Sequence, residues 1–356
     1  MSDIYQIYGH DAHEMTLKLL EASHAIRLVP QGGSVALKPN LVIASAPDNG
    51  ATTHVGVLSG CMEYFQAHGV TDISVIEGSW VGDETMRAMK CAGYDRVCAR
   101  YGVPFYDLKK DAVRKVKTAV GDIDICCRAL DAGLLVNLPV LKGHCQTAMT
   151  CALKNLKGCL PDREKRHFHT MGLQRPIAAL AAALKPGLCI VDSLCGDLVF
   201  EEGGTPVQTN RMFLGTDAVQ IDAYARALME LSPEDVPYIE LAERFGCGRA
   251  SWRPEDLINL NSPSDAAAYP RPSGKCASLT RNVRENQACS ACFANLVRAL
   301  YATGLHPRQP LFIGQGWQGQ SLDGLGIGKC CCGAAACASG CPPTAEQIAK
   351  LLQEHA

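Results

Sequence analysis

The distribution of cysteine is the feature that most restricts what this chain can fold into. The sequence contains 19 cysteines, and eight of them lie in residues 276–356. Disulfide bonds need an oxidising compartment, and the first fifteen residues lack the basic flank and apolar core of a signal peptide. We therefore expect a cytoplasmic protein whose clustered thiols bind a metal or carry out redox chemistry. The scattered cysteines fit a role as small buried core residues.

Charge and hydropathy argue against two classes of partner. The formal net charge is −2, and no run of like charges is long enough to form a nucleic-acid-binding arm. The most apolar stretch, residues 176–184, ends at Lys185-Pro186 and is shorter than a membrane span requires. We therefore expect neither nucleic acid nor a membrane among the partners.

The first 250 residues alternate between strand patterns and helix patterns. Residues 34–42, 72–78 and 133–141 have the apolar composition of buried strands, and residues 53–68 and 173–184 have helical periodicity. Near-continuous apolar strands that alternate with helices are typical of a parallel sheet covered on both faces. The sequence thus predicts an α/β fold with a mostly parallel, doubly wound sheet.

The composition changes after Ser251. Residues 251–275 are rich in proline, serine and aspartate, which favours a linker or a wrapping loop. We accordingly predict an α/β domain over residues 1–250, a linker over residues 251–275, and a small cysteine-rich iron-sulfur module over residues 276–356.

Thiols stand at the start of both helix patterns in this module. Cys289-Ser-Ala-Cys292 directly precedes an amphipathic helix pattern, and Cys341 precedes a second one that begins with the capping box Thr344 to Gln347. The free amides and the dipole at a helix N-terminus stabilise thiolates. Both positions are therefore suited to metal ligation.

The spacing of these thiols bears on which metal they bind. A zinc ribbon needs two C-x-x-C knuckles, and only one is present. A thioredoxin-like dithiol follows a strand, which Cys289 does not. One C-x-x-C with two distant cysteines, the last followed by proline, better suits an iron-sulfur cluster. Zinc remains the alternative.

Several segments resemble the domain-of-unknown-function 362 family. They are ALKPNLV, VNLPVLKGH, AMTCALKNLKG, IVDSL, GTDAVQIDAYA and the ending GIGKC with SGCPPTAEQIAKLL. The Gly-Cys-Pro-Pro element is also similar to one cluster ligand of hydrogenase small subunits. By position, the resemblance implies that a 4Fe-4S cluster is held by Cys289, Cys292, Cys330 and Cys341. The sequence departs from the simple pattern at Cys331, Cys332 and Cys337, which leaves the third ligand open and leaves room for a second cluster or a sulfur-transfer thiol.

A candidate substrate site follows from where the strands end. Ligands of α/β sheets bind beyond the carboxyl ends of strands, where Lys38-Pro39-Asn40 and Lys142-Gly143-His144 are expected. We predict catalytic roles for Lys142, for His144 as proton donor, and for Asp192 as general base or cation ligand. The predicted substrate-binding residues are Lys38, Asn40, Lys154, Asn155, Arg163, His167 and His169. The last three lie in PDREKRHFHT, which has the composition of a polar loop and places the two histidines at the spacing of one strand face.

Three hypotheses about function follow. The first is an oxygen-sensitive iron-sulfur enzyme, working by redox or Lewis-acid chemistry on a small anionic substrate. The second is an electron-transfer or assembly partner of another redox protein, without a substrate of its own. The third is a zinc-stabilised binding protein.

Overall fold

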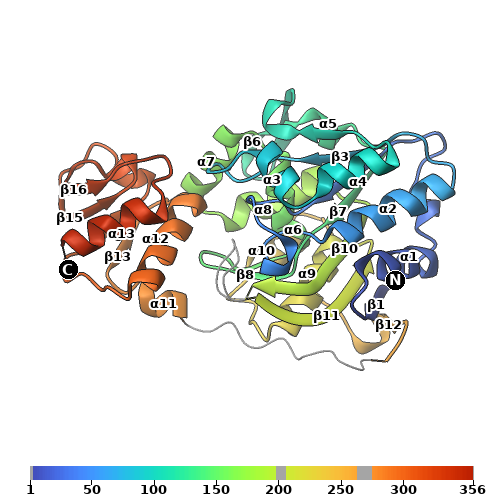
Figure 1. The fold of residues 1–356 in the computed structure, drawn as a ribbon. Coiled ribbons are helices and arrows are strands. Elements are labelled where there is room, and N and C mark those ends of the chain that lie inside the picture. Colours follow the sequence, from blue (N-terminus) through green and yellow to red (C-terminus); the bar gives the residue numbers. More distant parts are fainter. Residues whose placement is uncertain (1–2, 198–205, 263–274, 356) are drawn as a thin grey trace. The chain divides into compact units, whose positions relative to one another are not determined.

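A largely parallel sheet organises most of the chain in this computed structural model, which describes residues 3–197, 206–262 and 275–355. Eight strands of these described residues form the sheet (Figure 1). In spatial order they are β12 (Leu257–Asn259), β1 (Ile4–Tyr8), β11 (Pro206–Gly215), β10 (Leu188–Asp197), β7 (Leu134–Leu138), β2 (Val35–Pro39), β3 (Ile73–Glu77) and β4 (Phe105–Asp107). Strands β10, β7, β2, β3 and β4 run parallel, and β11 runs antiparallel to both of its neighbours.

Helices cover both faces of this sheet. Strands β7 and β10 are apolar and buried along their whole length, which is typical of a sheet covered on both sides. Ile190 of β10 belongs to the core beneath the helices of one face, whereas Cys189 lies near Asp222 of α9 on the other. The first face carries α1 (Ala12–Ala22), α2 (Val55–Ala67), α3 (Thr85–Cys91) and α4 (Tyr94–Tyr101). The second carries α6 (Ala152–Asn155) and α9 (Ala218–Leu228), with α8 (Gln174–Leu184) and α10 (Tyr238–Arg244) packed on each other. The predicted α/β fold with a mostly parallel sheet is confirmed.

Smaller elements complete this part of the chain. They are the hairpin of β5 (Val113–Thr118) and β6 (Gly121–Cys126), the hairpin of β8 (Lys142–His144) and β9 (Ala148–Thr150), the short helix α5 (Cys127–Leu130), and the 3-10 turns η1 (Ala25–Leu28), η2 (Pro47–Asn49), η3 (Leu108–Lys110), η4 (Leu156–Cys159) and η5 (Pro254–Asp256). The edge strand β12 and turn η5 fall inside residues 251–275, which we predicted to be a linker. Pairing of β12 with β1 places residues 257–259 in the sheet, and residues 263–274 lie outside the described residues.

The chain divides into two units, and one short internal segment belongs with the C-terminal part. The first unit is Met1–Glu164 with Gln174–Pro272, and the second is Lys165–Leu173 with Ser273–Ala356. The second unit contains a parallel sheet of four strands within the described residues. Its elements are α11 (Lys275–Leu279), β13 (Val283–Glu285), α12 (Ser290–Thr303), β14 (Leu311–Ile313), η6 (Gln315–Trp317), β15 (Leu322–Ile327), η7 (Lys329–Cys331), β16 (Ala334–Ala338) and α13 (Ala345–Glu354).

The segment PDREKRHFHT is a helix rather than the predicted polar loop. Helix α7 spans Asp162–Thr170. Two residues that are separated by one position face different sides of a helix, because the helical period is 3.6 residues. His167 is accordingly exposed and His169 buried, so the expectation that they share one face is wrong.

Candidate functional site

The amine of Lys38 lies fully buried at the carboxyl end of β2 and is surrounded by acceptors. Its Nζ donates to Glu77 Oε2 at 2.5 Å, to Pro39 O at 2.8 Å and to Asn155 Oδ1 at 3.3 Å. These bonds use all three N–H groups of the ammonium. Lys38 and Asn155, both expected to bind substrate, are therefore engaged with each other and with Glu77 inside the first unit.

Gly158 lies directly against this ion pair. A Cβ atom on Gly158 would overlap Glu77 Oε1 and come within 2.8 Å of Lys38 Nζ. Only glycine leaves room for two charged groups to pass so close to the backbone. The glycine after Lys157 is thus part of the packing of the buried pair.

Lys142 and Asn40 connect two neighbouring strand ends. Lys142, fully buried, donates from Nζ to Ala51 O at 2.6 Å and to Asn40 Oδ1 at 3.2 Å. Thr53 adds a second link, because its hydroxyl donates to Leu138 O at 2.7 Å and accepts from Asn40 N at 2.8 Å. The loop between β2 and α2 is therefore fastened to the end of β7.

His54 and Asp192 form a hydrogen-bonded pair at the same edge of the sheet. Asp192 Oδ2 accepts from the backbone N of His54 and lies 2.7 Å from Nδ1 of its ring, while Oδ1 accepts from Leu194 N. The other ring nitrogen, Nε2, lies 3.4 Å from Oδ1 of the highly exposed Asp48. This arrangement leaves Nε2 as the atom that can exchange a proton with a bound molecule.

The charge state of His54 follows from competing effects. Burial disfavours the imidazolium, but the carboxylates of Asp192 and then Asp48 outweigh burial and raise the pKa of His54 to about 9. The ring is therefore protonated at neutral pH and suited to donate a proton or to attract an anion. Asp192, a predicted catalytic residue, orients this ring.

Sequence reasoning missed His54, which lies within the residues 53–68 predicted to be helical. His54 occupies the N-cap position of α2, and the hydroxyl of Thr53 points to β7 instead. The available signal was positional: a histidine stands between the end of a parallel strand and the start of the next helix, where α/β ligands bind.

The other predicted residues of the first unit each bond to partners of their own. His144 is buried, and its Nδ1 accepts from Gln146 N and Thr147 N, which places the proton of a neutral ring on Nε2. Lys154 is buried and donates to Thr150 Oγ1 at 3.1 Å. Arg163 is exposed and donates to Asp124 Oδ2. His167 and His169 belong to the second unit.

In the second unit, three separate segments meet at the predicted metal ligands. Cys289 is the N-cap of α12, so Cys292 lies in its first turn. Asn295, one turn further on, donates from Nδ2 to Pro343 O at 2.8 Å. The backbone N–H of Lys329 donates to Gly340 O at 2.8 Å. These bonds hold the residues next to Cys330, Cys341 and Cys292 together.

The electrostatics of the thiols agree with this convergence. The pKa of Cys292 is raised first by burial and then by Cys289, Cys341 and Cys330. Burial and then Cys341 raise the pKa of Cys330. Mutual repulsion of this kind requires thiolates that are close together, and a bound cation would relieve it.

The neighbouring thiols point elsewhere. Cys331 is buried with its Sγ 3.8 Å from Gly314 O, and Cys332 Sγ lies 3.5 Å from Cys337 Sγ. Both thiols also act on a predicted ligand, because Cys331 raises the pKa of Cys292 and Cys332 raises that of Cys330. The identity of the third ligand therefore stays a prediction.

The thiols are not arranged around a single ion position. Among the described residues, no group of three or more His, Cys, Asp or Glu residues is placed to hold one metal ion. A zinc site needs four ligands at about 2.0–2.3 Å from a common point. In a 4Fe-4S cluster each thiolate binds a different iron, so the four thiolates lie further apart. Cys289, Cys292, Cys330 and Cys341 remain the predicted ligands of such a cluster.

His169 lies beside this thiol group rather than at the strand ends. Its Nε2 accepts from the backbone N of Ser290, the residue after Cys289, at 3.3 Å. The charge of Arg166, on the same helix, acts on the thiol of Cys330. The second half of α7 thus forms part of the surroundings of the cysteines.

The first unit matches a known family. The model described as "Domain of unknown function (DUF362)" matches residues 35–227, more than half of the chain. The chain belongs to this family. The DUF362 match includes Lys38, Lys142 and Asp192 but ends before the clustered cysteines, so the family match says nothing of the thiol group.

Two proteins of known name are similar to this DUF362 chain. The "Thylakoid-associated protein sll1697" of Synechocystis sp. is 25% identical over 232 residues, which cover 61% of this chain and 70% of that protein. The lactate racemase apoprotein from Thermoanaerobacterium thermosaccharolyticum aligns over 64% of this chain and 57% of its own, at 14% identity and a TM-score of 0.45. Every helix in the described residues is too short or too polar to cross a membrane.

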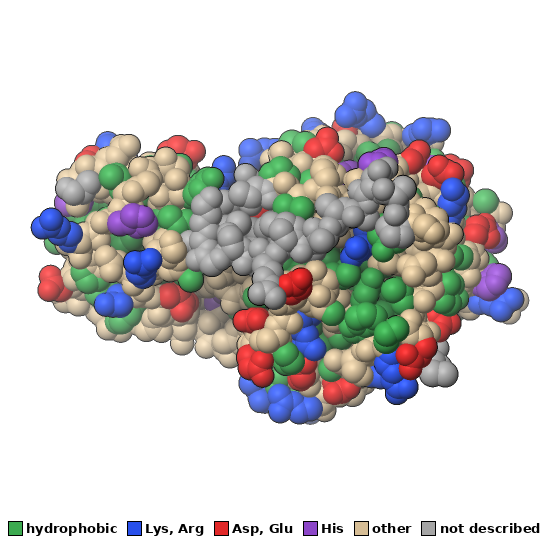
Figure 2. Space-filling model, turned by 90° about the horizontal axis from the view of Figure 1, so that it is seen from below, with side chains coloured by type: hydrophobic (Ala, Val, Ile, Leu, Met, Phe, Trp, Pro, Cys, Tyr) green, Lys and Arg blue, Asp and Glu red, His purple; other side chains and the backbone are tan. Residues whose placement is uncertain are grey.

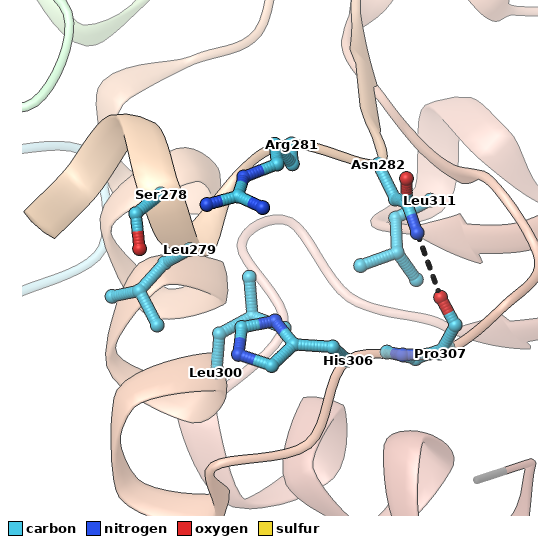
Figure 3. A pocket seen from close by; sticks show the side chains of 8 residues that line it. All are labelled: Ser278, Leu279, Arg281, Asn282, Leu300, His306, Pro307 and Leu311. Atoms are coloured by element: carbon cyan, nitrogen blue, oxygen red, sulfur yellow. Dashed lines mark hydrogen bonds between the residues drawn. The ribbon is translucent and has the colours of Figure 1, made fainter.

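A separate pocket lies in the second unit (Figure 3). Its volume is about 310 Å³, and the polar Ser278, Arg281 and His306 line it together with the apolar Leu300 and Leu311. The guanidinium of Arg281 gives the pocket a positive charge, which suits a small anion. Figure 2 shows basic and acidic side chains intermixed on the face that is seen.

Proposed function

We propose that this chain is an iron-sulfur redox protein in which Cys289, Cys292, Cys330 and Cys341 hold one 4Fe-4S cluster. The supporting observation is that hydrogen bonds bring the three segments carrying these thiols together around Cys292. A cluster in this position supplies one-electron transfer at a potential set by its surroundings. The buried His169 and the charge of Arg166 are the residues that would tune it.

In this proposal the first unit binds a small anionic substrate and moves a proton. His54 carries a positive charge at neutral pH, and its Nε2 is the donor. Its contact with the highly exposed Asp48 is weak in water, so a substrate carboxylate, phosphate or sulfonate can take the place of that carboxylate. Asp192 holds the ring in the orientation that this transfer needs.

Lys38 and Lys142 contribute indirectly. Both ammonium groups are fully buried and bonded to protein acceptors. They hold the strand ends and the β2–α2 loop in place, and their positive charge reaches the site through the protein. The proposal therefore assigns direct contact with substrate to His54 rather than to these lysines.

The burial of Lys38, Lys142 and Lys154 favours a second candidate. Cations that are 0–4% exposed do not offer a ready-made substrate pocket. An electron-transfer or assembly partner of another redox protein needs no such pocket. In that case the first unit would serve as a docking body for the partner.

Metal analysis of protein purified without oxygen tests the cluster. We expect about four iron and four labile sulfide per chain, a broad visible absorption, and bleaching by dithionite. Cys330→Ser should lose iron, whereas the matched variant Cys331→Ala should keep it. Protein that contains zinc and no iron would replace the proposal with a zinc-stabilised fold.

A second experiment separates enzyme from carrier. His54→Gln should leave iron content and reduction potential unchanged in either case. In an enzyme, the His54 ring resonances should shift on titration with acetate, phosphate or sulfite. The absence of any shift with all three anions would favour the carrier.

A further inference from the structure

Two cysteines of the second unit lie beside each other but outside the group of four. Cys332 Sγ and Cys337 Sγ are 3.5 Å apart. Four small residues, Gly333 to Ala336, separate them in the sequence. We propose that Cys332 and Cys337 form a reversible dithiol–disulfide couple that exchanges two electrons with low-molecular-weight disulfides or thiols.

The geometry requires little movement. A disulfide needs its sulfur atoms about 2.0 Å apart, so the two Sγ atoms must approach by about 1.5 Å. Cys332 follows the turn η7 and Cys337 lies on β16. The residues between them are Gly333 and the first three residues of β16, all glycine or alanine, so no large side chain resists the approach.

Access to solvent decides the order of events. Cys332 is exposed, and Cys337 is partly buried. The thiolate of Cys332 attacks a small disulfide RSSR, forms a Cys332–SR mixed disulfide and releases RS⁻. The thiolate of Cys337 then attacks Cys332 Sγ and releases a second RS⁻. The two thiol protons go to the two released thiolates, so the balance is one dithiol and one RSSR giving one protein disulfide and two RSH.

Gly328 lies between the Cys332–Cys337 pair and the predicted ligand Cys292. Gly328 O is an acceptor that both thiols share, at 4.0 Å from Cys332 Sγ and 3.5 Å from Cys337 Sγ. A Cβ atom on Gly328 would lie 3.6 Å from Cys292 Sγ. The oxidation state of the couple therefore acts on the backbone that packs against the group of four, although the couple itself does not depend on iron.

The test is a redox titration of the full chain, with and without iron. Anaerobic protein is equilibrated in glutathione buffers of graded potential, quenched in acid, alkylated with N-ethylmaleimide and mapped by mass spectrometry. We expect Cys332 and Cys337 to lose alkylation together, with a tenfold change in ratio per about 30 mV, the slope of a two-electron couple.

Variants distinguish the couple from unrelated thiols. Cys337→Ser should stop the reaction at a glutathione adduct on Cys332, and Cys332→Ser should leave Cys337 alkylated at every potential. Cys127→Ser, at a partly buried thiol of the first unit, should leave the midpoint unchanged.

Two results would overturn the proposal. One is alkylation of Cys332 and Cys337 at independent potentials without a disulfide-linked peptide. The other is loss of iron in both Cys332→Ser and Cys337→Ser, with both thiols protected in the iron-loaded protein, which would make them metal ligands. Failure to find iron would refute the cluster but leave the disulfide measurement intact.

Discussion

A single carboxylate oxygen of Asp192 lies 2.7 Å from both the backbone N and the ring Nδ1 of His54. The carboxylate is fully buried, and the ring is 18% exposed. The backbone bond fixes where α2 begins, and the ring contact fixes the orientation of Nε2. One residue of β10 thereby determines both the start of a helix and the direction of a proton donor.

The first prediction concerns the protonation of His54. Its pKa, followed by the ring resonances in an NMR titration, should be about 9. Asp192→Asn should lower it below the usual 6.5, because burial is then the dominant effect. Asp48→Asn should lower it less, because Asp48 is the weaker partner. A value of 6.5 or below in the wild type would contradict the assignment.

The second prediction is the effect of this pKa on stability. A histidine whose pKa is raised by folding stabilises the native state fully below about pH 6.5, and this contribution is lost as the pH rises through about 9. The free-energy difference between wild type and His54→Gln should therefore shrink by about 3 kcal/mol from pH 6 to pH 9.5. Urea unfolding at several pH values measures it. A difference independent of pH would show that the charged pair does not form.

The third prediction concerns the buried pair of Lys38 and Glu77. Lys38→Met should destabilise the first unit by about 3–5 kcal/mol, because it leaves a buried carboxylate without its partner. Hydrogen exchange of the β2 amides reports this loss. Lys38→Met with Glu77→Leu should recover most of it. Arg114→Met, which breaks an exposed pair with Asp131, should cost less than about 1 kcal/mol.

The fourth prediction concerns Gly158. Gly158→Ala should destabilise the first unit by about 1–3 kcal/mol, because the new methyl group overlaps Glu77 Oε1 in a packed interior. In a Glu77→Ala background the same substitution should cost less, since its nearest obstacle is gone. Equal costs in the two backgrounds would mean that another neighbour causes the strain.

The fifth prediction concerns the cap of the last helix. Thr344 and Gln347 form a capping box at the start of α13. Thr344→Ala should weaken the protection of the α13 amides from hydrogen exchange by about 1 kcal/mol. Thr118→Ala, in the β5–β6 hairpin of the first unit, is the control and should leave α13 unchanged. An undiminished protection would show that packing alone holds this helix.

Local patterns predicted the elements that depend on nearby residues. The buried strand β7, the helix α8 and the capping box at Thr344 all appear as expected. These features depend on the spacing of side chains along one stretch of backbone, which the sequence displays directly. Local composition gave the wrong prediction where contacts with distant residues decide the structure. Helix α7 was predicted to be a polar loop, but its buried His169 bonds to Ser290.

The sequence by itself determined the largely parallel α/β sheet, because buried strands and amphipathic helices each produce a characteristic spacing of apolar residues along the chain. It also placed Lys38 and Lys142 beyond the carboxyl ends of strands and identified Asp192 as a candidate catalytic residue. Only the tertiary structure decided what those side chains touch. Pairing of Lys38 with Glu77, and of Asp192 with His54, joins residues 39 and 138 positions apart, and no local pattern encodes a partner at such a distance.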